Sequence, residues 1–349
     1  MLLLLSGCDV SEPDPPRAAG PDVRLLGIYP GDGEGQDCGV AGADACGVPI
    51  DATLTLRFDR FLNPATVNRQ AIRVFTGDPA NSPSIPFDVA YDPVERVVEF
   101  RMPRGYAFQP RALYHIELVV PEASGDFGVR AFDGAPLAGG ASSLRSSFLT
   151  SRVSAPTARP PAPSCDEIVT QVLSSVSLGN CAASRCHRSR ANELGAAPEA
   201  LWLDGRANLR NTAINRVAHE TELGDTAGSP LQDSPRFGVQ MPIIDPKNPG
   251  NSYLLYKLLR RPSNFEPCAP GVASSVCAEP ADKTVSAYTT LPLREGESIE
   301  PSAEESLRLR EWFVRGEPMP YPGGPSTTVS LQGLRAINAF IAAGADCSE

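Results

Sequence analysis

A proline-rich segment at residues 152–164 divides the chain into two stretches whose hydrophobic residues repeat with different periods. Before it, apolar and polar side chains alternate in short runs, which is the pattern of half-buried β-strands. After it, apolar residues recur at intervals of three and four, which is the pattern of amphipathic helices. We therefore expect a multidomain chain, with an N-terminal all-β part and a C-terminal mostly α part.

The alternating runs lie within residues 22–151 and are separated by turns rich in Gly, Pro, Asp and Asn, as in a β-sandwich. Their apolar positions are Leu54, Leu56 and Phe58, then Phe87, Val89 and Tyr91, then Val98, Phe100 and Met102, and finally Tyr114, Ile116, Leu118 and Val120. His115 falls on the polar face of the last run, so we expect it at the surface.

Two segments of this half resemble the SbsA-type Ig-like domain of bacteria. They are residues 56–67 (LRFDRFLNPATV) and the closing Phe148-Leu149-Thr150. The resemblance covers roughly residues 22–151 and implies an Ig-like sandwich that acts as a spacer or display module.

The expected helices of residues 165–349 have apolar faces and polar starts. Ser252 is placed to cap a helix, and Ser302 with Glu305 forms the spacing of a capping box. The apolar faces include Ile168, Val169, Val172, Leu173 and Val176, then Leu254, Leu255, Leu258 and Leu259, and then Leu309, Trp312 and Phe313.

The end of the chain contains an internal repeat. An offset of 28 residues maps Ser302 onto Ser330, and Trp312 onto Phe340. The same offset maps Leu291 onto Met319. We predict two copies of a unit made of a turn and a helix.

The segment from Cys181 to His187 is the strongest chemical motif in the sequence. Its letters are CAASRCH, so Cys186 directly precedes the histidine. Two thiols can add to the vinyl groups of a haem, and a histidine next to the second thiol can ligate the iron. The usual motif has two residues between the cysteines, whereas four stand here. Zinc is disfavoured, because no second Cys/His pair has suitable spacing.

The surroundings of this motif resemble a cytochrome c-like domain of exported bacterial proteins. The matching segments are residues 201–203 (LWL), residues 245–254 (DPKNPGNSYL), Met319-Pro320 and residues 340–345 (FIAAGA). The resemblance covers residues 165–349. It implies one covalent haem c held by Cys181 and Cys186, with His187 and Met319 as axial ligands of the iron.

Several alternatives to this assignment stay open. Met241 and His219 are rival axial ligands, and Leu291 at that position would leave the iron five-coordinate, as a peroxidase or sensor requires. The motif could instead hold a Cys181–Cys186 disulfide. The chain would then be a haem-free envelope lipoprotein that serves adhesion or scaffolding.

The nine cysteines and the N-terminus indicate an oxidising compartment. Residues 1–8 (MLLLLSGC) resemble the end of a bacterial lipoprotein signal, which implies a lipid on Cys8, and residues 9–21 have the composition of a tether. Eight cysteines are left. The expected disulfides are Cys38–Cys46, Cys268–Cys277 and Cys165–Cys347.

Charge and motif content exclude several functions. The formal net charge is −10 and no basic run occurs, which argues against nucleic-acid binding. No hydrolase elbow, zinc-protease motif or phosphate loop occurs, so no small-molecule substrate is predicted and an electron carrier is favoured over an enzyme. We expect a lipid-anchored protein of the cell envelope, facing the periplasm or the cell surface, with a redox protein as its partner.

Overall fold

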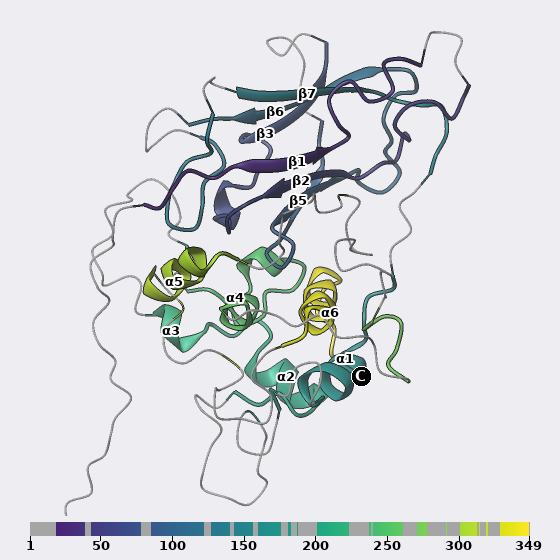
Figure 1. The fold of residues 1–349 in the computed structure, drawn as a ribbon. Helices are drawn as coiled ribbons and strands as arrows, with labels where there is room; N and C mark the ends of the chain where they lie inside the picture. Colours follow the sequence, from purple (N-terminus) through teal and green to yellow (C-terminus); the bar gives the residue numbers. More distant parts are fainter. Residues whose placement is uncertain are drawn as a thin grey trace, which may run out of the picture.

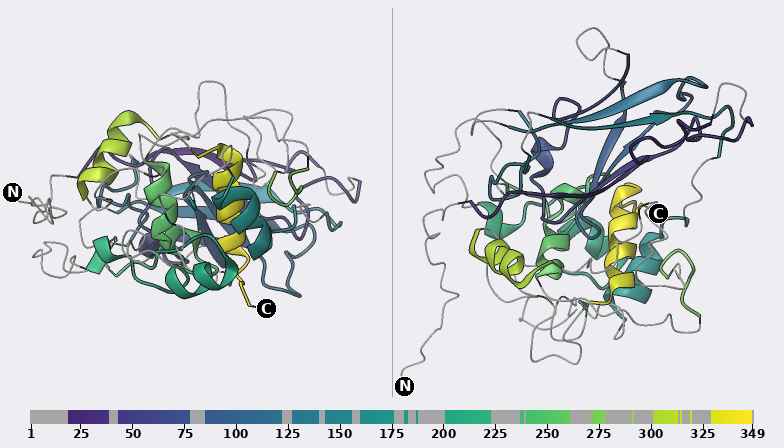
Figure 2. Two further views of the ribbon diagram at one scale, coloured as in Figure 1. Left: turned by 90° about the horizontal axis from the view of Figure 1, so that it is seen from below. Right: turned by 45° about the horizontal axis from the view of Figure 1, so that its top comes forward.

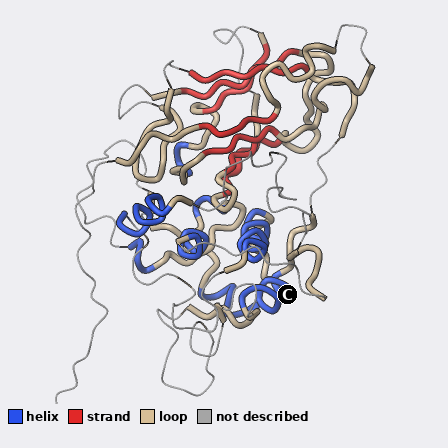
Figure 3. The backbone as a smooth tube through the Cα atoms, in the orientation of Figure 1, coloured by secondary structure: helices blue, strands red, loops and turns tan. Residues whose placement is uncertain are grey.

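The computed structural model describes residues 19–38, 43–77, 85–121, 127–139, 143–155, 160–175, 181–182, 187, 201–222, 237–238, 240–260, 271–277, 291, 301–312, 314, 319 and 329–348. Within these residues, two β-sheets stack as a sandwich and a group of helices packs beneath it (Figure 1). Apart from one short helical turn at Pro64–Thr66 in the sandwich half, the strands and the helices lie in separate halves of the molecule (Figure 3).

The sandwich has a four-stranded sheet in the order β1-β2-β5-β4 and a three-stranded sheet in the order β3-β6-β7. All neighbouring strands are antiparallel. The all-β part expected from the sequence is therefore present. The strands are β1 (Leu25–Tyr29), β2 (Leu54–Phe58), β3 (Ile72–Thr76), β4 (Asp88–Asp92), β5 (Val97–Arg101), β6 (Leu113–Val119) and β7 (Ser143–Leu149).

Strand β2 departs from the half-buried pattern that its sequence predicts. Leu54, Leu56 and Phe58 are fully buried between the sheets, as expected. However, Thr55 and Arg57 on the opposite face are also buried, with 0% and 3% of their surface exposed. The alternating sequence cannot show this, because the second face is covered by residues distant in the chain.

The helices of the C-terminal half are short. Beyond them, two single turns of 3₁₀-helix occur at Pro64–Thr66 and Pro249–Asn251. The helices are α1 (Cys165–Glu167), which continues as a π-helix (Ile168–Leu173), α2 (Arg206–Thr212), α3 (His219–Glu222), α4 (Tyr253–Leu259), α5 (Ala303–Trp312) and α6 (Leu331–Ala342).

The helices of the two copies of the predicted repeat begin in the same way. Helix α5 starts after Ser302 and α6 after Ser330, and each hydroxyl accepts the N–H three residues later at 3.0 Å. Only one of the two hydrogen bonds of the capping box expected at Ser302 is formed, the one that the Ser302 hydroxyl accepts. The carboxylate of Glu305 bonds to Arg60 and Phe61 of the sandwich instead. Ser252 also differs from expectation. Its hydroxyl accepts the N–H of Asp245 (2.9 Å) rather than capping α4.

The sandwich and the helices share one apolar cluster. Phe61 and Phe132 of the sandwich half belong to the core of the helical half. The Phe61 ring lies 5.8 Å from that of Tyr256 on α4, and Phe132 lies 5.8 Å from Phe237, measured between ring centroids. Two further views show the helices lying against the sandwich (Figure 2). Aromatic side chains from the two halves therefore bury one another.

The described parts of residues 152–164 lie along the sandwich. The Ala155 N–H donates to Asp51 (2.9 Å), and the Ile50 N–H donates to the Val153 carbonyl (3.1 Å). Farther along, Pro160 lines a cavity of about 170 Å³ together with Tyr91 of β4. These contacts hold both described parts of the segment against the sandwich.

Candidate functional site

The π-helix before Cys181 sets the position of the candidate haem motif. Ile168, Val169, Val172 and Leu173 are all buried in the π-helix. Its last carbonyl, that of Leu173, accepts the Ala182 N–H at 2.8 Å. Single π-turns are frequent at functional sites. The start of the motif is thus tied directly to a buried element.

A backbone hydrogen bond joins Cys181 and His187. The His187 N–H donates to the Cys181 carbonyl at 3.2 Å, although six positions separate the two residues. Both side chains are buried, with 6% of Cys181 and 7% of His187 exposed. Cys186 lies outside the described residues. The structure thus brings the first cysteine and the histidine of the motif together in the core.

The ring of His187 is oriented by the segment at residues 201–203. Its Nδ1 lies 3.0 Å from the Leu201 carbonyl, and its backbone carbonyl accepts the Leu203 N–H at 2.8 Å. A carbonyl oxygen can only accept, so Nδ1 carries the proton and Nε2 is left with a lone pair. Burial lowers the pKa of His187, and the charge of Lys257 acts in the same direction, while the bond to Leu201 opposes them. A neutral imidazole whose ring is held by such a bond can ligate a metal through Nε2.

Both candidate methionines lie at the same apolar cluster as Cys181. Met241 is 2% exposed, and Met319 is partly buried against the cluster. The backbone of Met241 is fixed, because its N–H donates to the Thr221 hydroxyl (3.0 Å) and its carbonyl accepts the Ala218 N–H (2.9 Å). His219 of α3, the third candidate ligand, is exposed.

Leu291 lies against the sandwich. A Cβ placed on Gly27 of β1 would lie 3.1 Å from a terminal methyl group of Leu291. The Leu291 carbonyl accepts a bond from Arg57 of β2 at 2.6 Å. The first copy of the repeat therefore contributes to the contact between the two halves.

Two of the expected cysteine pairs are disulfides in the structure, Cys38–Cys46 and Cys165–Cys347. The second joins the start of the helical half to its end. Cys277 is also disulfide-bonded, while its expected partner Cys268 and the expected lipid site Cys8 lie outside the described residues.

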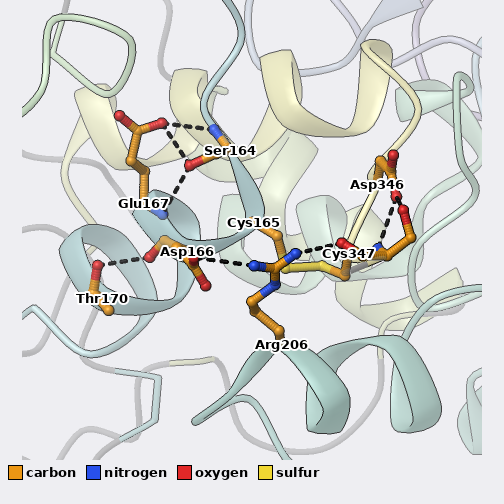
Figure 4. Close-up of a disulfide and its surroundings, with 9 residues drawn as sticks. Ser164, Cys165, Asp166, Glu167, Thr170, Arg206, Asp346 and Cys347 are labelled. Carbon is orange, nitrogen blue, oxygen red and sulfur yellow. Dashed lines mark hydrogen bonds and ion pairs between the residues drawn. A yellow bond between two sulfur atoms is a disulfide. The ribbon is translucent and has the colours of Figure 1, made fainter.

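The Cys165–Cys347 disulfide is surrounded by polar contacts (Figure 4). Arg206 of α2 pairs with Asp166 (3.2 Å) and donates to the Ser348 carbonyl. Ser164 and Glu167 form a capping box at the start of α1. Helices α1 and α2 and the chain end are thereby held together around the disulfide.

The contact between the halves contains buried charges that the sequence did not reveal. Arg335 of α6 pairs with Glu95 (2.7 Å), whose other oxygen lies 3.4 Å from Arg57 of β2. All three residues are at most 3% exposed. Asn338 of α6 donates to Asp92 at 2.9 Å. Burial, together with the charge of Glu95, raises the pKa of Asp92 to about 7.

A second buried cluster surrounds Arg60. Its guanidinium pairs with Asp133 and with Glu305 of α5, each at 2.8 Å. Burial raises the pKa of Glu305, while Arg60 acts against this shift. A pairing between residues 60 and 305 has no local sequence signal, because it depends on how the halves dock.

Among the described residues, no group of three or more His, Cys, Asp or Glu side chains is arranged to hold a metal ion. The described helices also include none that is long and apolar enough to cross a membrane.

No protein-family model matches the sequence, and no curated protein matches it. Among solved structures, domains 1–6 of the surface layer protein SbsC align with 40% of this chain and 14% of their own, at 7% identity and a TM-score of 0.24. The S-layer protein rSbsC(31-844) aligns with 40% of this chain and 14% of its own, at 9% identity and a TM-score of 0.23. The native conformation of E. coli alpha-2-macroglobulin aligns with 39% of this chain and 6% of its own, at 15% identity and a TM-score of 0.25. The chain thus spans 14% or less of these structures, and scores this low do not establish a shared fold.

Proposed function

We propose that the protein is an exported, lipid-anchored electron carrier of the c-type cytochrome kind, with one covalently attached haem. Cys181 and Cys186 would form the thioether bonds, His187 would be one axial ligand and Met319 the other. Cys8 would carry the lipid, which places the protein in the cell envelope, facing the periplasm or the cell surface. Its partner would be another redox protein, and no substrate is chemically changed.

The observation that carries this proposal is the state of His187. A histidine on a protein surface needs neither burial nor a fixed ring. His187 has both, because its Nδ1–H is bonded to the Leu201 carbonyl (3.0 Å) and the residue is buried. The donor types fit a haem, since the backbone of His187 is bonded to that of Cys181, and Cys181, Met241 and Met319 share one apolar cluster.

A bound haem would supply an iron that alternates between the ferrous and ferric states, at a relatively high potential when its ligands are His and Met. The chain's own residues perform the supporting work. The Leu201 carbonyl fixes the His187 ring and its tautomer, which raises the basicity of Nε2. The apolar cluster around Cys181 and Met241 excludes water from the site.

Met319 remains the proposed second ligand, on the strength of the resemblance to the closing Met-Pro element. Met241 is the competitor, because it is buried in the same cluster and its backbone is fixed by Thr221. The two assignments differ in an observable way, since only the true ligand affects the spectrum of the iron.

A second function would make the protein a haem-free envelope lipoprotein, with a Cys181–Cys186 disulfide and a role in adhesion or scaffolding. The observation in its favour is the chain's use of disulfides elsewhere, as at Cys38–Cys46 and Cys165–Cys347. Thioether bonds and a disulfide at the same cysteines exclude each other.

The test is to export the full chain together with a cytochrome c maturation system and to record its absorption spectrum and pyridine haemochrome. The full chain is needed because Phe61 and Phe132 complete the core of the helical half. We expect a c-type spectrum that survives acid–acetone extraction. A folded, colourless protein would refute the proposal and favour the disulfide.

Single variants then assign the ligands. His187→Ala is expected to abolish the low-spin spectrum, whereas His219→Ala, at an exposed histidine, serves as the matched control. Met319→Ala should remove the charge-transfer band of methionine-ligated ferric haem. If Met241→Ala removes this band instead, Met241 is the ligand.

A further inference from the structure

The chain enters the fold at the junction between the sandwich and the helices. The Gly20 N–H donates to Asp133 at 2.9 Å, and Arg60 donates to the Pro21 carbonyl at 2.6 Å. Two residues later, the Val23 N–H donates to the Pro136 carbonyl at 2.8 Å. From Gly20 onward the chain is therefore held against the body of the protein.

The residues that hold the entering chain also bind helix α5. Arg60 pairs with Glu305 of α5 at 2.8 Å, and Asp133 lies 3.8 Å from Arg308 of the same helix. A Cβ on Gly20 would lie 2.9 Å from the Arg308 side chain. The point at which the chain enters is thus directly beside α5.

The strand pairing shows that the other end of the four-stranded sheet is far from the point at which the chain enters. Leu25, at the start of β1, pairs with Phe58, whose neighbour Arg57 bonds to Glu95 beside α6. Strand β5 runs from that end to Phe100, which pairs with Leu54. Tyr106 follows β5, so it lies beyond the far end of the four-stranded sheet.

The length of the tether limits how far the junction can be from the lipid. Gly20 is 12 positions after Cys8. Fully extended, this segment reaches about 40 Å. A random coil of 12 residues has a root-mean-square span of about 20 Å. A lipid at Cys8 therefore holds Gly20 and α5 within one short tether of the bilayer.

We infer that the anchored protein turns its junction toward the bilayer, so that residues 20–24 and the exposed face of α5 lie over the lipid headgroups. This inference rests on the lipid anchoring proposed above. Leu307, which is 49% exposed, lies on that face, and the Glu304 and Arg310 side chains are exposed there as well. The sandwich and the helices then stand side by side on the membrane. The helical half is thus within reach of a redox partner embedded in that membrane.

In the test, a histidine tag replaces residues 1–8 of the full chain. The tagged protein is bound to vesicles of neutral phosphatidylcholine. The vesicles also contain a nickel-chelating lipid and a lipid with a quenching headgroup. A fluorophore is attached through Leu307→Cys on α5 or through Tyr106→Cys at the far end. Tyr106 is 66% exposed, so both positions accept a label without disturbing the core. The unmodified chain, labelled in the same way, gives the background from native thiols.

Quenching at position 307 is expected to exceed that at position 106 by about threefold or more, given a tether span of about 20 Å. Equal quenching, or stronger quenching at position 106, would overturn the inference. Inserting about 24 Gly and Ser residues in the tether raises its span to about 35 Å and should bring the ratio toward one. An unchanged ratio would show that the tether does not set the orientation.

Failure of the anchoring and failure of the orientation can be told apart. Labelling of the natural chain with a radioactive fatty acid reports on the lipid at Cys8 alone. The tagged vesicles supply an anchor at the same place in either case, so their result reports on the orientation alone.

Discussion

Replacing Asp92 with Asn should change how the stability of the protein depends on pH. Asp92 ends strand β4, and its carboxylate accepts the N–H groups of Val94 (2.8 Å) and Glu95 (3.1 Å) and the amide of Asn338 on α6 (2.9 Å). Burial is the main cause that raises its pKa to about 7, and the charges of Glu95 and Glu99 add to it. The folded protein thus binds a proton at Asp92 that the unfolded chain releases near pH 4.

The sign of the effect follows from this proton. Between pH 4 and pH 7 the folded state holds more protons than the unfolded state, so the free energy of unfolding falls as the pH rises. The slope is on the order of 1 kcal/mol per pH unit, and the loss between pH 5 and pH 7 is about 2 kcal/mol. Above pH 7 the Asp92 contribution becomes constant.

The variant Asp92→Asn keeps the shape of the side chain and removes its charge. The new amide can still accept from Val94 and Glu95. Its NH₂ group would face that of Asn338, but the Asn338 Oδ1 has no hydrogen-bond partner among the described residues and can turn toward it. We expect the variant to match the native protein near pH 5 and to be more stable by about 2 kcal/mol at pH 7.

The assay is urea unfolding of the full chain at pH 5, 6 and 7, with Asp88→Asn as the matched control. Asp88 is exposed at the other end of β4, so water solvates its charge. Burial also lowers the pKa of His187, so the unfolded chain takes up a proton there at a higher pH than the folded protein does, and the His187 contribution to stability has the opposite sign. Comparing the variants at each pH removes this contribution. Parallel pH profiles for the native protein and Asp92→Asn would refute the reasoning.

Three further pairs of variants test the packing of the fold by denaturant unfolding. Arg60→Met should lower the free energy of unfolding by about 3–5 kcal/mol, because buried Glu305 would lose its counter-charge and buried Asp133 would keep only the more distant Arg308, at 3.8 Å. Arg24→Met, at a side chain 71% exposed, should lower it by less than about 1 kcal/mol. Gly35→Ala should destabilise more than Gly33→Ala. Both glycines have positive φ, but a Cβ at Gly35 would lie 2.7 Å from the Gly47 Cα, while a Cβ at Gly33 meets nothing within 4 Å; equal losses would contradict the clash. Cys165→Ser should lower the free energy of unfolding by up to about 5 kcal/mol, since its disulfide spans 182 residues. Cys38→Ser should lower it by less, since its disulfide spans 8 residues. The reverse order would contradict the chain-entropy argument.

The strands at Leu54, Val89, Val98 and Tyr114 could be predicted because apolar residues recur at every second position in each, a property visible within five or six residues. The starts of α5 and α6 were predictable for a similar reason, since a serine cap acts on the N–H three residues later. The disulfides Cys38–Cys46 and Cys165–Cys347 followed from the parity and placement of the cysteines.

The sequence points to the candidate site through one contiguous segment, and the haem attachment inferred from it stays a prediction. The motif from Cys181 to His187 is contiguous, so its chemistry can be recognised in the sequence. The bond from His187 to the Leu201 carbonyl joins residues 14 positions apart. That carbonyl belongs to the backbone, which every residue type has, so no sequence pattern could reveal it.

Local properties of the chain are encoded in short segments of the sequence, because alternation, helix caps and the spacing of a motif depend on near neighbours. Contacts between the halves depend on docking, which brings Arg60 to Glu305 and Arg335 to Glu95 across more than 200 positions. Burial in that contact turns ordinary surface residue types into buried ion pairs and raises the pKa of Asp92. Neither burial nor pairing is a property of a residue alone, so both emerge only when the two halves fold together.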